Sequence, residues 1–219
     1  MKKEIVVYSG GLDSTVLLAM VHASNHAVTA LHFCYGQKHS QEETQAALTV
    51  CTHFNVSMKI IELAFPAWGF KSELLAAQGD IPAREYNEED LKKTVVPFRN
   101  GIMLSIAAGI AASCGVKTVY IGAHTDDHAV YPDCRPGFLY NMHTAIEYGT
   151  DMQVGLAFPF CEKTKADIVK LGAELGAPMD LSYSCYNGGE IHCGVCSTCR
   201  ARKEAFISVG FPDMTEYKE

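Results

Sequence analysis

Two adjacent glycines separate a β-branched apolar run from an apolar helical pattern near the start of the chain. The stretch reads VVYSGGLDSTVLL, and it predicts a buried strand at residues 4–8 and a helix at residues 12–23. Such a turn aims the free N–H groups and positive dipole end of the helix at whatever lies above it, and glycine permits close approach. Ser9 and Ser14 add hydroxyl donors. The turn is therefore either an ordinary tight connection or, as we expect, an anion nest for a phosphate or pyrophosphate.

The alternation of strand and helix continues along the chain. Further strands are expected at 28–33, 58–63, 117–121 and 154–157, and helices at 42–54, 101–113, 138–148 and from a capping box at 164–167 to Gly176. This order predicts an α/β fold, a Rossmann-like parallel sheet with helices on both faces, in one domain spanning residues 1–219. Residues 66–95 are polar and punctuated by Pro and Gly, so we expect an insertion or lid there.

Composition narrows the class of protein. The 219 residues are 48% hydrophobic, enough for a sizeable core, and carry a formal net charge of −7. This balance disfavours a nucleic-acid partner, which needs clustered Lys and Arg. No apolar run approaches the roughly 18 residues of a membrane span, and the chain starts without a signal-peptide pattern, so we expect a cytoplasmic protein with no membrane partner. Nine cysteines then point to metal binding or reactive thiols rather than disulfides.

Four of these cysteines form a compact cluster late in the chain. Cys185, Cys193, Cys196 and Cys199 follow the spacing C-x7-C-x2-C-x2-C. Four thiolates so spaced can close a tetrahedral zinc site, which would be structural because no ligand position stays open. An iron–sulfur cluster is the rival interpretation. His192 offers an alternative ligand, but its place beside Cys193 makes simultaneous ligation awkward. We expect a zinc-binding knuckle over residues 182–202.

A second polar concentration follows the strand expected at residues 117–121. Residues 124–135 read HTDDHAVYPDCR, with acids, histidines, a tyrosine, a thiol and an arginine together. Loops at the carboxyl ends of parallel strands line the ligand crevice of open α/β sheets. The loop is therefore either a solvated acidic segment or, as we expect, part of a site that grips a polar small molecule and a metal ion.

The SGGLDS segment resembles the pyrophosphatase loop of the N-type ATP pyrophosphatases, or PP-loop family, which cleave ATP between its α and β phosphates. The resemblance implies a fold like that of the adenine nucleotide alpha hydrolases, with Asp13 near a Mg²⁺ ion. It also implies an ATP site made of Tyr8, Ser9, Gly10, Gly11, Leu12, Asp13, Ser14, Thr15, Val16, Leu17 and Leu18.

Three more motifs narrow the resemblance. YGQKH at 35–39, VPFRN at 96–100 and YPDCR at 131–135, together with the four cysteines, are similar to the 7-cyano-7-deazaguanine synthases of queuosine precursor biosynthesis. The second motif usually reads VPGRN in that family, and Phe98 stands in place of its glycine. The motifs span the chain from Tyr8 to Cys199.

That resemblance implies conversion of 7-carboxy-7-deazaguanine and ammonium to the nitrile with ATP, through an adenylated carboxylate and an adenylated amide. The implied catalytic residues are Ser9, Asp13, Ser14 and Lys165. The implied substrate-binding residues are Arg99, Asn100, Tyr131, Asp133, Cys134 and Arg135. Asp133 and the backbone carbonyls of residues 131–135 are our candidate acceptors for the base, and Tyr131 or Phe98 is its candidate stacking partner. Nitrile formation needs no thiol, so Cys134 is expected to pack or orient rather than react.

Two other functional classes remain open from the sequence. One is a tRNA-thiolating or other amide-forming enzyme of the same loop family, which the acidic charge disfavours. The other is a zinc-knuckle module that binds ATP without turnover, which the dense polar loop disfavours. The resemblance also implies a homodimer, to which the apolar segment 206–211 would contribute. No glutaminase domain fits in this length, so free ammonium is the expected nitrogen source.

Overall fold

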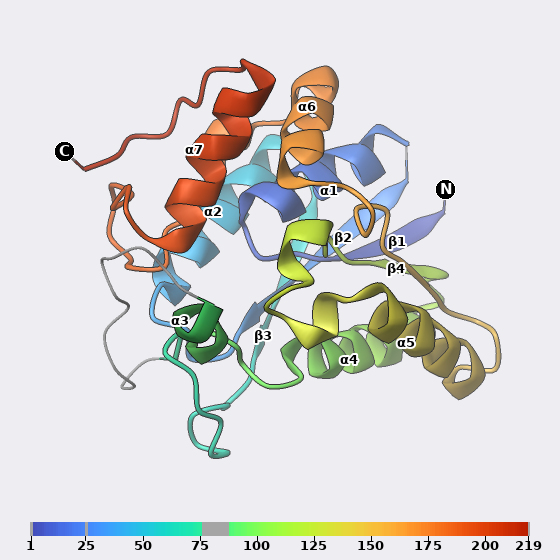
Figure 1. Ribbon diagram of the computed structural model, residues 1–219. Coiled ribbons are helices and arrows are strands. Elements are labelled where there is room, and N and C mark those ends of the chain that lie inside the picture. The colour runs from blue at the N-terminus through green and yellow to red at the C-terminus, as the bar shows by residue number, and fades with distance from the viewer. Residues whose placement is uncertain (1, 25, 76–87, 219) are drawn as a thin grey trace.

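A five-stranded parallel sheet forms the centre of the computed structural model, which describes residues 2–24, 26–75 and 88–218. Its order is β3-β2-β1-β4-β5, and all four neighbouring pairs are parallel. The strands are β1 (Lys3–Val7), β2 (Ala27–Cys34), β3 (Ser57–Glu62), β4 (Thr118–Tyr120) and β5 (Gly155–Ala157). The predicted parallel sheet is confirmed, with the first strand at its centre (Figure 1).

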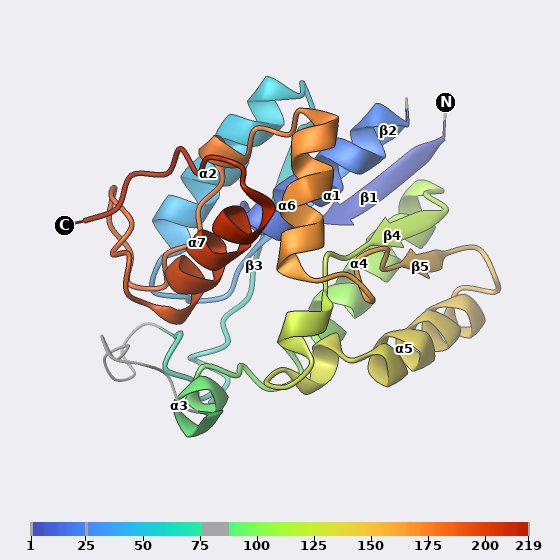
Figure 2. The same ribbon diagram turned by 45° about the horizontal axis from the view of Figure 1, so that its top comes forward.

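Helices cover both faces of this sheet. They are α1 (Leu12–Ala23), α2 (Ser40–His53), α3 (Glu88–Lys93), α4 (Arg99–Cys114), α5 (Pro136–Gly149), α6 (Lys165–Leu175) and α7 (Ser197–Val209). Figure 2 shows α4 and α5 on one side and α1, α2, α6 and α7 on the other. Neighbouring residues of β1 alternate between the two cores, Ile5 packing with Leu104 of α4 and Val6 with Val16 of α1.

The helix ends follow the signals in the sequence. α4 ends at Gly115, whose φ of 66° is left-handed, and α6 ends the same way at Gly176, with φ 63°. At the start of α6, Thr164 Oγ1 accepts from Asp167 N, and Asp167 Oδ2 accepts from Thr164 N at 2.9 Å. This reciprocal pair is the predicted capping box.

The structure differs from the sequence prediction at the end of the cysteine cluster. Helix α7 begins at Ser197, where no helix was expected, and it packs against α6. Its Phe206 is buried in the core of its own chain, so this ring is not available to the dimer surface suggested for 206–211, whereas Ile207 is 79% exposed. The expected insertion at 66–95 contains turns and the short α3 in its described parts, and residues 76–87 lie outside them.

This topology gathers the polar loops at one edge. The loop from β1 to α1, the turn after β2 and the loop after β4 all leave the carboxyl ends of adjacent strands. Within the described residues, no helix is long and apolar enough to cross a membrane.

Candidate functional site

A cleft opens above the carboxyl ends of β1, β2 and β4. The β1–α1 loop contributes Tyr8, Ser9, Gly11, Leu12, Asp13 and Ser14 to its wall, and the β4 end contributes Ile121, Gly122, Ala123, His124, Asp127, Tyr131 and Cys134. The rest of the wall is made by Val7, Phe33, Tyr35, His39, Glu43, Arg99, Asn100, Met103, Lys165, Tyr183, Ser184, Tyr186 and Thr198. Residues from seven separate segments of the chain therefore meet in one site.

Hydroxyls and backbone groups shape the glycine turn into a compact loop. Ser9 Oγ lies 3.0 Å from Ser14 Oγ and accepts a hydrogen bond from Gly11 N at 3.1 Å. Ser14 Oγ also donates to Gly11 O. Gly10 has a φ of 84°, and a Cβ there would lie 2.6 Å from the carbonyl oxygen of Glu43, so only glycine fits. The loop precedes α1, as an anion nest requires.

Not every residue of the predicted ATP segment faces the cleft. Val16, Leu17 and Leu18 are fully buried in the core, and Thr15 is buried with its hydroxyl 3.1 Å from the Tyr8 hydroxyl. These four residues hold α1 in place. The cleft-facing part of the segment is Tyr8, Ser9 and residues 11–14, whereas Gly10 packs against α2.

Four charged or titratable side chains meet beside the loop. Lys165 Nζ donates to Asp13 Oδ2 at 2.7 Å, and His124 Nε2 lies 3.5 Å from the same oxygen and 3.4 Å from Asp127 Oδ2. Burial raises the pKa of Asp13, but Lys165 and His124 outweigh it and hold that pKa well below its usual range. Burial lowers the pKa of Lys165, and the Asp13 carboxylate more than compensates. Asp13 is therefore ionised and Lys165 cationic.

The same cluster suits a magnesium ion. Asp13 Oδ1 is buried and has no hydrogen-bond partner among the described residues, and Asp127 supplies a second carboxylate. Carboxylate oxygens are the protein ligands that Mg²⁺ prefers. Burial raises the pKa of Asp127, and a nearby cation would reverse that shift.

The far half of the cleft is aromatic and contains one half-buried cation, Arg99. Arg99 Nη1 donates to the Tyr35 hydroxyl at 3.0 Å, with the guanidinium 5.7 Å from the Tyr35 ring centre. Tyr131 reaches Thr94 Oγ1 through its hydroxyl at 3.0 Å. An arginine held among tyrosines is suited to grip an anionic group bidentately beside a stacked ring.

Asn100 and Cys134 form a buried pair next to Arg99. Asn100 Nδ2 lies 3.2 Å from Cys134 Sγ and donates to the Asp133 carbonyl oxygen. Burial raises the pKa of the Cys134 thiol, and Asp127 raises it further, so the group is a neutral thiol rather than a nucleophilic thiolate.

Three predicted substrate residues lie outside the cleft lining. Asp133 Oδ2 accepts from Asn100 N at 2.8 Å, so this carboxylate caps the first turn of α4. Arg135 is exposed, and its Nε donates to the carbonyl oxygen of His128. Phe98 is 57% exposed and packs edge-on against Phe138. All three side chains make contacts elsewhere in the chain, and the structure does not bring them to the cleft.

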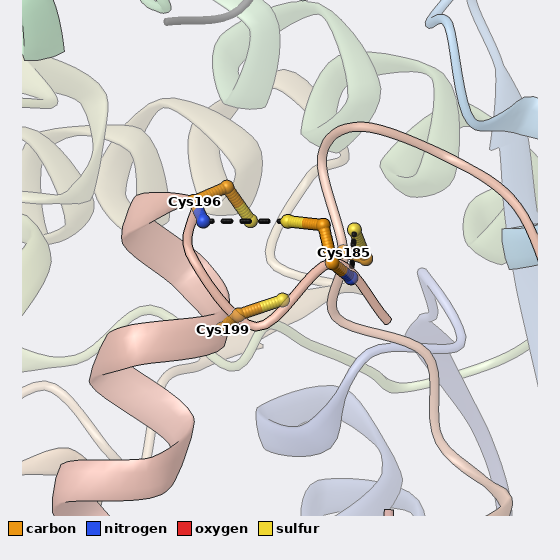
Figure 3. Close-up of side chains that lie close together, drawn as sticks. Cys185, Cys196 and Cys199 are labelled. Carbon is orange, nitrogen blue, oxygen red and sulfur yellow. Dashed lines mark hydrogen bonds between the residues drawn. The ribbon is translucent and has the colours of Figure 1, made fainter. Parts of the chain in front are cut away.

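The four predicted zinc ligands come together. Their sulfur atoms all lie within 4.8 Å of one another, which fits tetrahedral zinc with Zn–S bonds of about 2.3 Å. Figure 3 shows Cys185, Cys196 and Cys199 pointing toward one another, the last from the first turn of α7. His192 Nε2 instead accepts from Ser184 N at 2.9 Å, so it is turned away from the thiolates.

The knuckle is also a wall of the cleft. Tyr183 N donates to Gly10 O at 2.9 Å, which pins the glycine turn, and Gly189 N donates to Glu42 Oε1 at 2.7 Å, which pins the knuckle to α2. Tyr183, Ser184, Tyr186 and Thr198 line the cleft from this side. The cysteine cluster therefore positions cleft residues that sequence reasoning did not select.

Sequence reasoning also missed cleft residues from two other segments. His124 and Asp127 lie in the polar loop flagged by its composition, and Tyr35 and His39 lie in the YGQKH motif. Glu43 follows His39 by four residues, one helical turn later, and a helix starting at residue 40 places both at its first turn.

The sequence of this chain resembles those of known proteins over almost its whole length. A family model described as "Queuosine biosynthesis protein QueC" matches residues 3–210. A 7-cyano-7-deazaguanine synthase of Porphyromonas gingivalis (strain ATCC 33277) is 46% identical over 217 residues, covering 99% of this chain and 98% of that protein. One from Desulfotalea psychrophila is also 46% identical, covering 99% of each.

Solved structures share the fold at low identity. A 4-thiouridine synthetase in complex with RNA and bound ATP superposes with a TM-score of 0.53 at 16% identity, covering 95% of this chain and 50% of that one. NMN synthetase from Francisella tularensis gives 0.50 at 14% identity, covering 95% and 77%. These likenesses bear on the fold alone, and they agree with the predicted PP-loop architecture.

Proposed function

The chain belongs to the QueC family of queuosine biosynthesis proteins, and on that premise we propose how its cleft makes 7-cyano-7-deazaguanine from 7-carboxy-7-deazaguanine, ammonium and ATP. The observation that carries the assignment of roles is that the glycine turn, the Asp13–Lys165 pair and the aromatic half with Arg99 share one cleft. The end of the cleft proposed to activate the carboxylate with ATP is therefore continuous with the end proposed to bind the substrate.

The first step makes the carboxyl group reactive. A carboxylate is a poor electrophile, so its oxygen attacks the α-phosphorus of ATP and pyrophosphate leaves. Charge builds on the departing group, and the N–H groups of the turn, the hydroxyls of Ser9 and Ser14, and Lys165 are placed to stabilise it. A Mg²⁺ ion held by Asp13 and Asp127 would neutralise further phosphate charge when bound.

The activated carboxyl group is then converted first to an amide and next to a nitrile. Ammonia attacks the acyl carbon, loses a proton and displaces AMP, which leaves a primary amide. A second ATP adenylates the amide oxygen with release of pyrophosphate, and loss of AMP and the two remaining N–H protons gives the nitrile. Both activations need the same anion nest, so one cleft serves both.

Arg99 is the proposed ligand of the substrate carboxylate. It is half-buried, its guanidinium is fixed by the Tyr35 hydroxyl, and it lines the same cleft as Tyr131. Asn100 orients Cys134, and the neutral thiol fills space beside the substrate rather than attacking it. Mass spectrometry showing an adduct of product mass on Cys134 would contradict this role.

The cysteine cluster is proposed as a structural zinc site. Its four sulfurs leave no open position for a water or substrate, so zinc would stabilise the knuckle and hold the cleft wall. We also propose a cytoplasmic homodimer that uses free ammonium and has no nucleic-acid or membrane partner. The net charge of −7 supports the absence of a nucleic-acid partner.

One assay tests the activity. The protein is incubated with 7-carboxy-7-deazaguanine, ammonium and Mg-ATP, and nitrile, AMP and pyrophosphate are measured by mass spectrometry and coupled release. We expect two AMP per nitrile formed. A protein that binds ATP but forms no substrate-dependent AMP would overturn the proposal and favour a binding module.

A further inference from the structure

Glu43 places a carboxylate in the cleft that the reaction scheme above does not use. It lies in the first turn of α2, and its side chain is 15% exposed and lines the cleft. Gln37 Nε2 donates to its Oε2 at 3.0 Å, and His39 Nε2 lies 3.3 Å from its Oε1. Each carboxylate oxygen can accept two hydrogen bonds, so each keeps one acceptor direction after these contacts.

The two partners are themselves fixed. Gln37 Oε1 accepts from Tyr35 N at 2.8 Å, and Gln37 Nε2 also donates to Phe33 O, which sets the orientation of the amide. His39 is buried and its ring stacks on Tyr186 at 5.4 Å. The Glu43 carboxylate is therefore held in one position before any ligand arrives, which lowers the cost of binding.

The carboxylate also keeps its charge. Burial raises the pKa of Glu43, but His39 and the hydrogen bond from Gln37 outweigh this and hold that pKa below its ordinary value. At neutral pH the group is ionised and accepts hydrogen bonds only. It therefore attracts a ligand edge that carries donors and repels one that presents an acceptor.

Of the two heterocyclic bases among the reactants, the 7-deazaguanine ring has the edge that matches this requirement, and adenine does not. A 7-deazaguanine ring carries N1–H beside an exocyclic amine, two donors spaced as the two oxygens of a carboxylate are. Adenine presents its amine beside an N1 lone pair, which a carboxylate repels. The sequence candidate for this role, Asp133, is occupied by Asn100 N and does not line the cleft.

We propose that Glu43 is the residue that reads the base of the substrate, its two oxygens accepting from N1–H and the exocyclic amine of the 7-deazaguanine ring. The inference rests on the proposed function. Tyr35 and Tyr186 line the same part of the cleft and supply aromatic surface for the ring. Charge-assisted pairs of this kind discriminate strongly, because a substrate that lacks a donor leaves a buried acceptor unpaired.

The test compares Glu43→Gln with Glu174→Gln. Both remove one carboxylate charge, but Glu174 is exposed on α6 and does not line the cleft. The amide of Glu43→Gln can still donate to His39 in its other tautomer, so the variant is expected to fold. We expect kcat/KM for 7-carboxy-7-deazaguanine to fall about 100-fold or more in Glu43→Gln. KM for ATP should stay within about threefold of the wild-type value, and Glu174→Gln should match the wild type in both parameters.

A second substrate makes the reading of the base visible. The analogue without the exocyclic amine, 7-carboxy-7-deazahypoxanthine, should be a substrate about 100-fold or more worse than 7-carboxy-7-deazaguanine for the wild type. Glu43→Gln should lose most of that preference, which a merely structural role would not change.

The outcomes separate this inference from the proposed function. No nitrile from the wild type would overturn the proposed function. An active wild type that uses both substrates within about threefold overturns the role of Glu43, even if the variant does not fold. A rise in KM for ATP alone in Glu43→Gln would also overturn it and place this carboxylate on the nucleotide.

Discussion

The Phe98 ring lies against the α-carbon of Gly101, so that a Cβ built on Gly101 would stand 2.4 Å from two ring atoms. Phe98 itself has a φ of 55°, in the left-handed region that favours glycine. The chain therefore combines a strained residue with a helix glycine that accommodates its ring.

This pair predicts non-additive stability. Gly101→Ala alone should destabilise by about 1 kcal/mol, because the ring must leave its contact with Phe138. In a Phe98→Gly background the same change should stabilise by about 0.5–1 kcal/mol, because alanine favours the helix. Urea unfolding of the four proteins gives the coupling, and additivity within about 0.5 kcal/mol would contradict this account.

The two glycines of the turn should differ in tolerance. Gly10→Ala forces a Cβ to 2.6 Å from Glu43 O at a φ of 84°, so we expect loss of stability and about a 100-fold or greater loss of kcat/KM. A Cβ on Gly11 meets nothing closer than Ser9 Oγ at 3.2 Å, and φ there is −78°. Gly11→Ala should therefore fold with near-normal stability. Equal melting temperatures for the two variants would refute the distinction.

Lys165 should matter for pyrophosphate departure. Lys165→Ala removes the cation that pairs with Asp13, and we expect kcat to fall by about 100–1000-fold in a pyrophosphate-release assay. Lys163→Ala is the matched control, since Lys163 contributes its backbone carbonyl to Thr125 and the change keeps that group. A Lys165→Ala protein with more than about half the wild-type rate would exclude this role.

Zinc loss should damage both stability and substrate binding. Cys196→Ser should abolish stoichiometric zinc by elemental analysis, lower the melting temperature and raise KM, because the knuckle holds Tyr183 and Tyr186 in the cleft wall. Cys114→Ser is the control, since that thiol is exposed on α4. Wild-type KM in zinc-free Cys196→Ser would separate the knuckle from the site, and iron in the wild type would identify a cluster instead.

The tail should show a pH-dependent contribution through Asp213. Its carboxylate pairs with Arg202, which is 1% exposed, and accepts from the Tyr217 hydroxyl. Burial raises the pKa of Asp213, but Tyr217 and Arg202 outweigh it and lower the net value. A depressed folded pKa stabilises the fold above the unfolded value near 3.9, and this is lost as pH falls through the folded pKa.

Asp213→Asn should therefore lower the free energy of unfolding by about 3 kcal/mol at pH 7, since it leaves Arg202 unpaired. The difference from wild type should shrink below about pH 4. Asp180→Asn, at an exposed position, is the control. A deficit in Asp213→Asn that stays constant down to about pH 2 would show that the carboxylate charge is not the cause.

Local signals in the sequence predicted most of the fold. Between Val6 and Leu18 the apolar pattern changes from that of a strand to that of a helix, with two glycines at the change. The Thr164–Asp167 capping box and Gly176 mark the two ends of α6 through local hydrogen bonds that need no tertiary contact. Helix α7 escaped because its sequence STCRARKEAFISV is mostly polar, and its burial depends on Arg202 reaching Met179 O and Ser182 Oγ. The buried residues recur at helical spacing, but Arg202 occupies a buried position where an apolar residue would mark the pattern.

The sequence predicted the site residues that belong to recognisable motifs, and it predicted less well those whose position depends on tertiary packing. Asp13, Lys165 and the four cysteines were selected correctly as neighbours, although Lys165 is 152 residues from Asp13. Asp133 and Arg135 have side chains that could bind the substrate. The Asp133 carboxylate instead accepts from the backbone at the start of α4, and Arg135 is exposed to solvent. Glu43 looks like an ordinary charged helix position until the fold turns it into the cleft.

The Asp13–Lys165 contact implies thermodynamic coupling between metal and nucleotide. A cation that takes Asp13 alone would strand the lysine ammonium, and a phosphate that takes Lys165 alone would strand a carboxylate, and either orphaned charge is costly in a confined site. When the cation and the phosphate bind together, Asp13 pairs with the cation and Lys165 pairs with the phosphate, so neither side chain is left without an opposite charge. Magnesium and ATP should therefore raise each other's affinity, equally and reciprocally, before any substrate carboxylate enters.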